Sequence, residues 1–132
     1  MNRGKSIIHS IAHSTLQVLI VDDEVDICYL LSGMLRQKKI RTTYVNTLSD
    51  AELLLKKEVP QVIFLDNHLP DGLGMDFISY IKKYYPLTKI AMITANDTYA
   101  DRQKASTQGA DFFISKPFSR QTIYNVVTEA TS

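Results

Sequence analysis

The sequence has almost no net charge, a single cysteine and no long hydrophobic run, and each shortage excludes a class of protein. A formal net charge of +1 over 132 residues gives no electrostatic basis for binding nucleic acid or an anionic membrane surface. One cysteine, Cys28, cannot form an internal disulfide, which suits a reducing cytoplasm, and its apolar neighbours indicate a small core residue. The composition that remains is typical of a soluble globular protein.

The first fifteen residues show no sign of a targeting signal. Their longest apolar run is two isoleucines, which is too short for a signal peptide or a membrane span. His9 and His13 have the spacing of two metal ligands on a helix, but no further ligand lies nearby in the sequence. We therefore expect a flexible tail over residues 1–15 and one domain over residues 16–132.

Short apolar segments alternate with segments of helical periodicity along this domain. The predicted strands are Gln17 to Val21, Ile40 to Val45, Gln61 to Leu65, Lys89 to Ile93 and Phe112 to Ser115. Helical spacing of apolar residues follows the first, third and fifth of these strands, and a shorter helix follows Ser49, a candidate N-cap. The segment Thr98 to Gln108 is mostly polar, with Tyr99, Ala100 and Ala105 to bury before Gly109, so this helix is expected to be the least firmly held.

The alternation of strands and helices is typical of βαβ units around a parallel sheet. Three predicted strands are apolar without strict alternation, as expected when helices cover both faces. The second strand includes Arg41 and Thr43, which places it at an edge. Right-handed crossovers then favour a flavodoxin-like, doubly wound (βα)5 fold with five parallel strands in the order 2-1-3-4-5.

Polar residues end four of the predicted strands at the rim where such folds bind ligands. These residues are Asp22, Asp23 and Glu24 after the first strand, Asp66 after the third, Thr94 after the fourth and Lys116 after the fifth. Each has an ordinary structural explanation, as a charge near a helix end, a turn residue, a cap or a surface lysine. Together they indicate phosphoryl chemistry, because crowded carboxylates favour Mg²⁺ and a lysine attracts a phosphoryl group.

The motifs at these strand ends resemble the receiver domain of bacterial two-component response regulators, over about Leu16 to Ala130. The resemblance is carried by VLIVDDE from Val18, FLDNHLPDG from Phe64, ITA from Ile93 and GADFFISKPF from Gly109. Gly74 also stands where the family has a glycine at the start of the third helix. The resemblance implies a phosphoacceptor signalling domain.

The resemblance implies a role for each matching residue. Asp66 would attack phosphorus, and Asp23, Asp66 and the backbone carbonyl of His68 would bind Mg²⁺ while Asp22 holds a coordinated water. Lys116 would pair with Asp66 and then with the phosphoryl group. Thr94 and Phe113 would act as the switch. A cis peptide bond between Lys116 and Pro117 would hold the backbone of the lysine in place.

The resemblance also implies partners. The phosphodonor would be a histidine kinase or a histidine phosphotransfer protein, and a protein partner would read the fourth helix, fifth strand and fifth helix. Because the chain ends at Ser132, we expect no attached effector, no direct contact with nucleic acid or membrane, and a monomer or a phosphorylation-linked dimer. Its only chemistry would be phosphorylation and dephosphorylation of its own Asp66.

Three other functions compete with this one. A phosphatase of the haloacid-dehalogenase type needs a second aspartate two residues after the first, where this chain has His68. A nucleotide-binding module needs a glycine-rich phosphate loop, which follows none of the predicted strands. A pseudo-receiver would keep the fold and act only as an interaction module.

Overall fold

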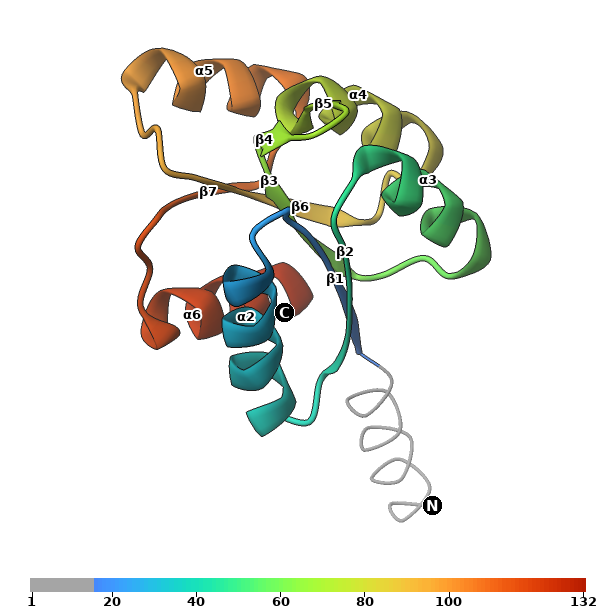
Figure 1. The fold of residues 1–132 in the computed structure, drawn as a ribbon, viewed down its shortest axis with the longest axis vertical. Helices are drawn as coiled ribbons and strands as arrows, with labels where there is room; N and C mark the ends of the chain where they lie inside the picture. The colour runs from blue at the N-terminus through green and yellow to red at the C-terminus, as the bar shows by residue number, and fades with distance from the viewer. Residues whose placement is uncertain (1–15) are drawn as a thin grey trace.

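A computed structural model of the chain describes residues 16–132, and the predicted tail lies outside the described residues. One parallel sheet of five strands forms its centre (Figure 1). The strands are β1 (Gln17–Val21), β2 (Arg41–Val45), β3 (Val62–Asp66), β6 (Lys89–Thr94) and β7 (Phe112–Ser115). The helices are α2 (Val25–Gln37), α3 (Leu48–Lys57), α4 (Gly74–Tyr84), α5 (Tyr99–Gln108) and α6 (Arg120–Thr131).

The strand order is β2-β1-β3-β6-β7, which is the predicted 2-1-3-4-5 order of a flavodoxin-like fold. β2 lies at an edge of the sheet, as its alternating sequence predicts. Sequence reasoning did not predict the small antiparallel pair of β4 (His68–Leu69) and β5 (Gly72–Leu73), which lies between β3 and α4. The bounds of β2, β3 and β6 differ from the predicted ranges by one residue at some ends, and those of β1 and β7 agree with them.

Two helical layers explain why the central strands are apolar throughout. α2 and α6 pack on one face of the sheet, where they cover Val18, Ile20 and Phe64 (Figure 1). α3, α4 and α5 pack on the other face, where they cover Leu19 and Leu65. Successive residues of a strand point to opposite faces of the sheet. Because both faces are covered, both alternating sets of side chains in the central strands must be apolar.

Two local predictions about the helices are wrong. Thr47, not Ser49, caps α3, since its hydroxyl accepts a hydrogen bond from the backbone N–H of Asp50. Tyr99 is 78% exposed and Ala100 is also exposed, whereas both were predicted to be buried, and Ala105 is the residue that anchors α5 in the core. α5 nevertheless ends at Gly109 as predicted, in a left-handed conformation that suits glycine.

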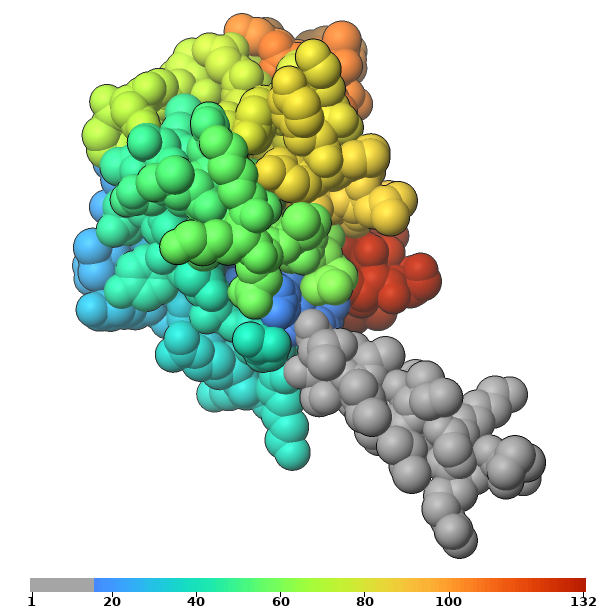
Figure 2. Space-filling view, turned by 90° about the vertical axis from the view of Figure 1, so that its right-hand side faces the viewer, coloured from blue at the N-terminus to red at the C-terminus, as the bar shows by residue number. Residues whose placement is uncertain are grey.

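Because all five strands are parallel, the connections that lead from each helix into the next strand lie at the rim opposite the carboxyl ends of the strands. Figure 2 shows the side of the molecule that carries α3, which forms a green part of the surface beside a yellow one. No helix within residues 16–132 is both long and apolar enough to cross a membrane.

Candidate functional site

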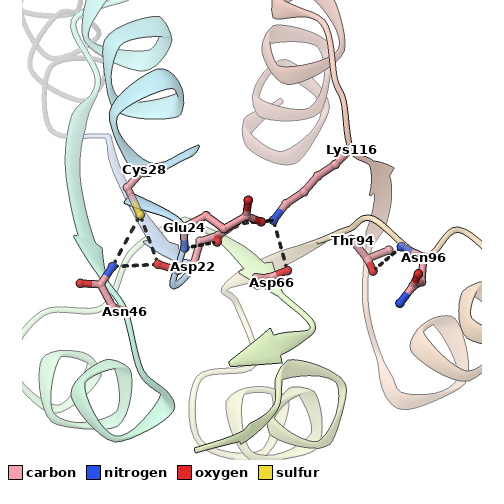
Figure 3. A network of polar contacts seen from close by, with 8 residues as sticks. All are labelled: Asp22, Glu24, Cys28, Asn46, Asp66, Thr94, Asn96 and Lys116. Carbon is pink, nitrogen blue, oxygen red and sulfur yellow. Dashed lines mark hydrogen bonds and ion pairs between the residues drawn. The ribbon is translucent and has the colours of Figure 1, made fainter. Parts of the chain in front are cut away.

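The parallel register of the sheet brings the polar strand ends to one rim. Asp66 is the last residue of β3 and Thr94 is the last residue of β6, and the two strands are neighbours. Asp22 directly follows β1, on the other side of β3. Lys116 follows β7, and its backbone N–H donates to the carbonyl of Thr94 at 2.8 Å. All four residues therefore lie at one rim of the sheet (Figure 3).

Three carboxylates form the centre of this rim. One oxygen from each of Asp22, Asp23 and Asp66 can be chosen so that all three lie within 4.8 Å of one another. Asp22 and Asp66 are 2% and 5% exposed, whereas Asp23 faces solvent. The cluster thus joins two buried carboxylates to one that is open to solvent.

The ammonium of Lys116 lies among these carboxylates. Its Nζ is 2.6 Å from Oε1 of Glu24, 3.0 Å from Oδ2 of Asp22 and 3.4 Å from Oδ1 of Asp66. The contact with Asp22 is an ion pair without hydrogen-bond geometry, because that buried oxygen has no hydrogen-bond donor among the described residues. The lysine is therefore shared by three acids, and its shortest contact is with Glu24.

Burial and mutual repulsion change the protonation of the site. Burial raises the pKa of Asp66 to about 6, and the charge of Asp22 adds to this rise against the opposing effect of Lys116. Burial also raises the pKa of Asp22. Burial by itself lowers the pKa of Lys116, but its contacts with Glu24 and Asp22 outweigh this and raise that pKa above its ordinary value. The negative charge in this cluster is only partly compensated by one lysine.

A set of contacts that sequence reasoning missed supports the acidic loop after β1. The side-chain amide of Asn46 donates to the backbone oxygen of Asp22 at 2.8 Å, and the thiol of Cys28 lies 3.3 Å from the same oxygen (Figure 3). Oδ1 of Asp22 accepts from the backbone N–H of Glu24 at 2.9 Å. Cys28 is buried, as predicted, and burial raises the pKa of its thiol to about 11, so it is a structural residue.

The loop after Asp66 is fixed at both ends. Oδ1 of Asn67 accepts from the backbone N–H of Met75, and the backbone N–H of Gly74 donates to the carbonyl of Asn67. The carboxylate of Asp71 accepts from the first two backbone N–H groups of α3, both at 2.9 Å. Sequence reasoning treated Asp71 only as part of the acceptor motif, since its partners lie more than twenty residues away.

The predicted switch residues lie on neighbouring strands, Thr94 at the end of β6 and Phe113 on β7. The hydroxyl of Thr94 accepts from the backbone N–H of Asn96 at 3.1 Å (Figure 3). Phe113, on β7, is half-buried, and the guanidinium carbon of Arg102 on α5 lies 4.8 Å from its ring centroid. The peptide bond between Lys116 and Pro117 is cis.

The residues present fit a Mg²⁺ site. Hard carboxylate oxygens are the ligands that Mg²⁺ prefers, and a cation would relieve the repulsion that raises the pKa of Asp66. Oδ2 of Asp22 is buried, and among residues 16–132 it has the ion pair with Lys116 but no hydrogen-bond donor, so it can accept a further contact from a cation or its coordinated water. The imidazole of His68 is not part of this cluster, and His68 is exposed on β4.

Curated relatives of this chain are bacterial response regulators. The response regulator protein PilR of Pseudomonas aeruginosa is 36% identical over 117 residues, which are 89% of this chain and 26% of that protein. The probable transcriptional regulatory protein TcrX of Mycobacterium tuberculosis is 32% identical over 80% of this chain and 45% of its own length. The chain thus spans less than half the length of these relatives.

Solved structures show the same fold at similar identity. The beryllofluoride-activated NtrC4 receiver domain dimer superimposes with a TM-score of 0.83 at 35% identity, over 86% of this chain and 94% of that one. The receiver domain of NtrX from Brucella abortus superimposes with a TM-score of 0.81 at 31% identity, over 87% of this chain and 99% of that one. Residues 18–128 match the family described as the response regulator receiver domain. The chain therefore belongs to the receiver domains of two-component response regulators.

Proposed function

We propose that residues 16–132 form the receiver domain and that Asp66 is its phosphoacceptor. The observation that carries this proposal is the position of Asp66, which is buried at the end of β3 between the acids after β1 and the ammonium of Lys116. A pseudo-receiver that acts without phosphorylation finds no support in a chain with this acidic pocket and these relatives.

Each side chain then has a defined part in the transfer. One oxygen of Asp66 forms a bond to phosphorus while the bond from phosphorus to the donor breaks, and the donor leaves with that electron pair. Asp22, Asp23 and Asp66, with the His68 carbonyl, would hold Mg²⁺, which supplies positive charge to the phosphoryl oxygens. Lys116 would contact a phosphoryl oxygen and Thr94 another. Beyond this reaction at Asp66, we assign the domain no enzymatic activity.

The proposed partners follow from the family. A histidine kinase or a histidine phosphotransfer protein would donate the phosphoryl group, in the cytoplasm. A protein partner would read the surface of α5, β7 and α6. On the α5 and β7 part of this surface, a groove is lined by Tyr99, Arg102, Gln103 and Phe113. Since the activated NtrC4 receiver is a dimer, a phosphorylation-linked dimer is one form of this read-out and a monomer is the other.

Phosphorylation by a small donor tests the proposal. The protein is incubated with acetyl phosphate and Mg²⁺, and its intact mass is measured. We expect one phosphoryl adduct on the wild type and on Asp76→Asn, which changes an exposed aspartate outside the cluster, and none on Asp66→Asn. An adduct that persists in Asp66→Asn, or no adduct on the wild type, would contradict the assignment.

A further inference from the structure

Glu24 is the N-cap residue of α2, but its side chain does not cap that helix within the described part of the chain. Instead, Oε1 of Glu24 reaches across the rim to Nζ of Lys116, 92 positions away in the sequence, at 2.6 Å (Figure 3). The side chain of Glu24 is 59% exposed and that of Lys116 is 10% exposed. A solvent-facing acid thus makes the shortest contact of an almost buried lysine.

This contact competes with the position that Lys116 needs for phosphoryl transfer. Nζ of Lys116 is 0.8 Å farther from Oδ1 of Asp66 than from Oε1 of Glu24, the difference between 3.4 Å and 2.6 Å. A phosphoryl group on Asp66 would attract the ammonium toward itself, so Lys116 must give up some of its contact with Glu24. The exposed glutamate can move into solvent when that happens, because the structure buries little of it.

The negative charge of the rim also opposes phosphoryl transfer to Asp66. Asp22, Asp23, Glu24 and Asp66 place four acids at a rim that has one lysine, and a divalent cation with Lys116 offsets three of the four charges. The remaining negative charge repels an anionic phosphodonor at close range. Glu24 is the acid among the four that lies outside the predicted metal cluster, so it can be neutralised without loss of a carboxylate ligand.

We propose that Glu24 is a positioning residue that holds Lys116 at the outer edge of the site and thereby restrains phosphoryl transfer to Asp66. This inference rests on the function proposed above. Glu24 acts through Lys116 and does not touch the reacting atoms. Neutralising it frees the lysine for the phosphoryl group and removes one repulsive charge.

The experiment measures binding of beryllofluoride, an analogue of the phosphoryl group, by amide chemical-shift titration in the presence of Mg²⁺. We expect Glu24→Gln to bind about two- to fivefold more tightly than the wild type, the effect of removing one exposed ion pair. Glu129→Gln, which makes the same charge change at an exposed position of α6, should bind as the wild type does. Higher salt should narrow the difference, since the Glu24 end of the pair faces solvent.

The outcomes separate this inference from the proposed function. If the wild type binds beryllofluoride, Asp66→Asn does not, and Glu24→Gln binds equally or more weakly, the restraint by Glu24 is refuted and the acceptor site stands. If Glu129→Gln tightens binding as much as Glu24→Gln does, net charge explains the gain and the contact with Lys116 does not. If the wild type does not bind beryllofluoride, the proposed function fails and this inference fails with it.

Discussion

Gly74 lies directly against the peptide group of Asp66. A Cβ atom at position 74 would overlap the backbone oxygen of Asp66 and would lie 3.0 Å from Cγ of Leu65. The first turn of α4 is thus packed onto the end of β3, with the N–H of Gly74 bonded to the carbonyl of Asn67 at 2.8 Å. The resemblance predicted a glycine here, and the structure supplies the reason, which is space and not backbone conformation.

Gly74→Ala should destabilise the protein by about 1–3 kcal/mol, because overlap with backbone atoms cannot be relieved by rotating a side chain. It should also slow phosphorylation by acetyl phosphate, since the peptide group of Asp66 must shift. Urea unfolding measures the first effect and intact mass against time the second.

Gly33→Ala is the matched control for this substitution. Gly33 lies inside α2, and no heavy atom counted among residues 16–132 is within 4 Å of its added Cβ. Alanine should therefore stabilise the helix by about 0.5–1 kcal/mol. Equal stability of Gly74→Ala and the wild type would show that α4 can move away from Asp66 without cost.

Asp66→Asn should stabilise the protein when Mg²⁺ is absent. Burial raises the pKa of Asp66 from its ordinary value of 3.8 to about 6, so the folded state holds a proton that the unfolded state releases. The neutral carboxyl therefore favours the folded state over the unfolded state. This contribution to stability is fully present below pH 3.8 and is lost as the pH rises through about 6. At pH 7.5 the ionised, buried Asp66 costs roughly 1–3 kcal/mol, which Asp66→Asn removes.

Urea unfolding at several pH values in EDTA measures this effect. The gain in Asp66→Asn should shrink as the pH is lowered through 6, because the wild-type carboxyl becomes neutral. Asp76→Asn, at an exposed site, serves as the control. A gain that stays constant with pH would have another cause than ionisation of Asp66.

Mg²⁺ should raise the melting temperature, and this shift should weaken at acidic pH. Metal binding stabilises the folded state by mass action, and it requires ionised carboxylates. Because the pKa of Asp66 is about 6, protons compete with the metal below that pH. Melting curves with and without Mg²⁺ at pH 7.5 and pH 5 measure the effect.

Asp23→Asn should reduce the Mg²⁺ shift most cleanly, since Asp23 is the exposed member of the cluster and its replacement disturbs packing least. Na⁺ at matched ionic strength controls for general screening. A Mg²⁺ shift that is the same in Asp23→Asn as in the wild type would place the metal elsewhere.

Asp97→Asn should loosen α5. Nε and Nη2 of Arg102 donate to Asp97 at 2.5 and 2.9 Å, and the hydroxyl of Ser115 donates to the same carboxylate. These hydrogen bonds lower the pKa of Asp97 to about 2, so their contribution to stability is present above pH 3.8 and is lost as the pH falls through about 2. Since Ala105 is the buried residue of α5, this polar contact adds a tie between the start of the helix and β7.

Amide hydrogen exchange at pH 7 measures that loosening. Exchange should become several-fold faster in α5 of Asp97→Asn and should be unchanged in α6. Asp50→Asn, which makes the same charge change at an exposed position in the first turn of α3, is the control. Uniformly faster exchange in all helices would indicate global destabilisation instead of release of α5.

The periodicity of apolar residues predicted the strands, their order and the rim where the site lies. That prediction succeeded because it depends on neighbours in the sequence and on general rules of βαβ connection. The prediction failed at Ser49, which was assigned as an N-cap because it is a serine. It also failed at Tyr99, which was assigned to the core because it is aromatic. Thr47 and Ala105 take those roles because only the three-dimensional packing decides which candidate is used.

The local pattern of apolar residues is enough to place Asp22, Asp23, Asp66 and Lys116 at the ends of strands in one parallel sheet. How Lys116 is shared among the acids, with Glu24 at the shortest distance, depends on the folded structure, and so does the way Asn46 and Gly74 hold the loops on either side. These contacts join residues far apart in the chain or depend on gaps of a few tenths of an ångström. Local propensity contains no information about either.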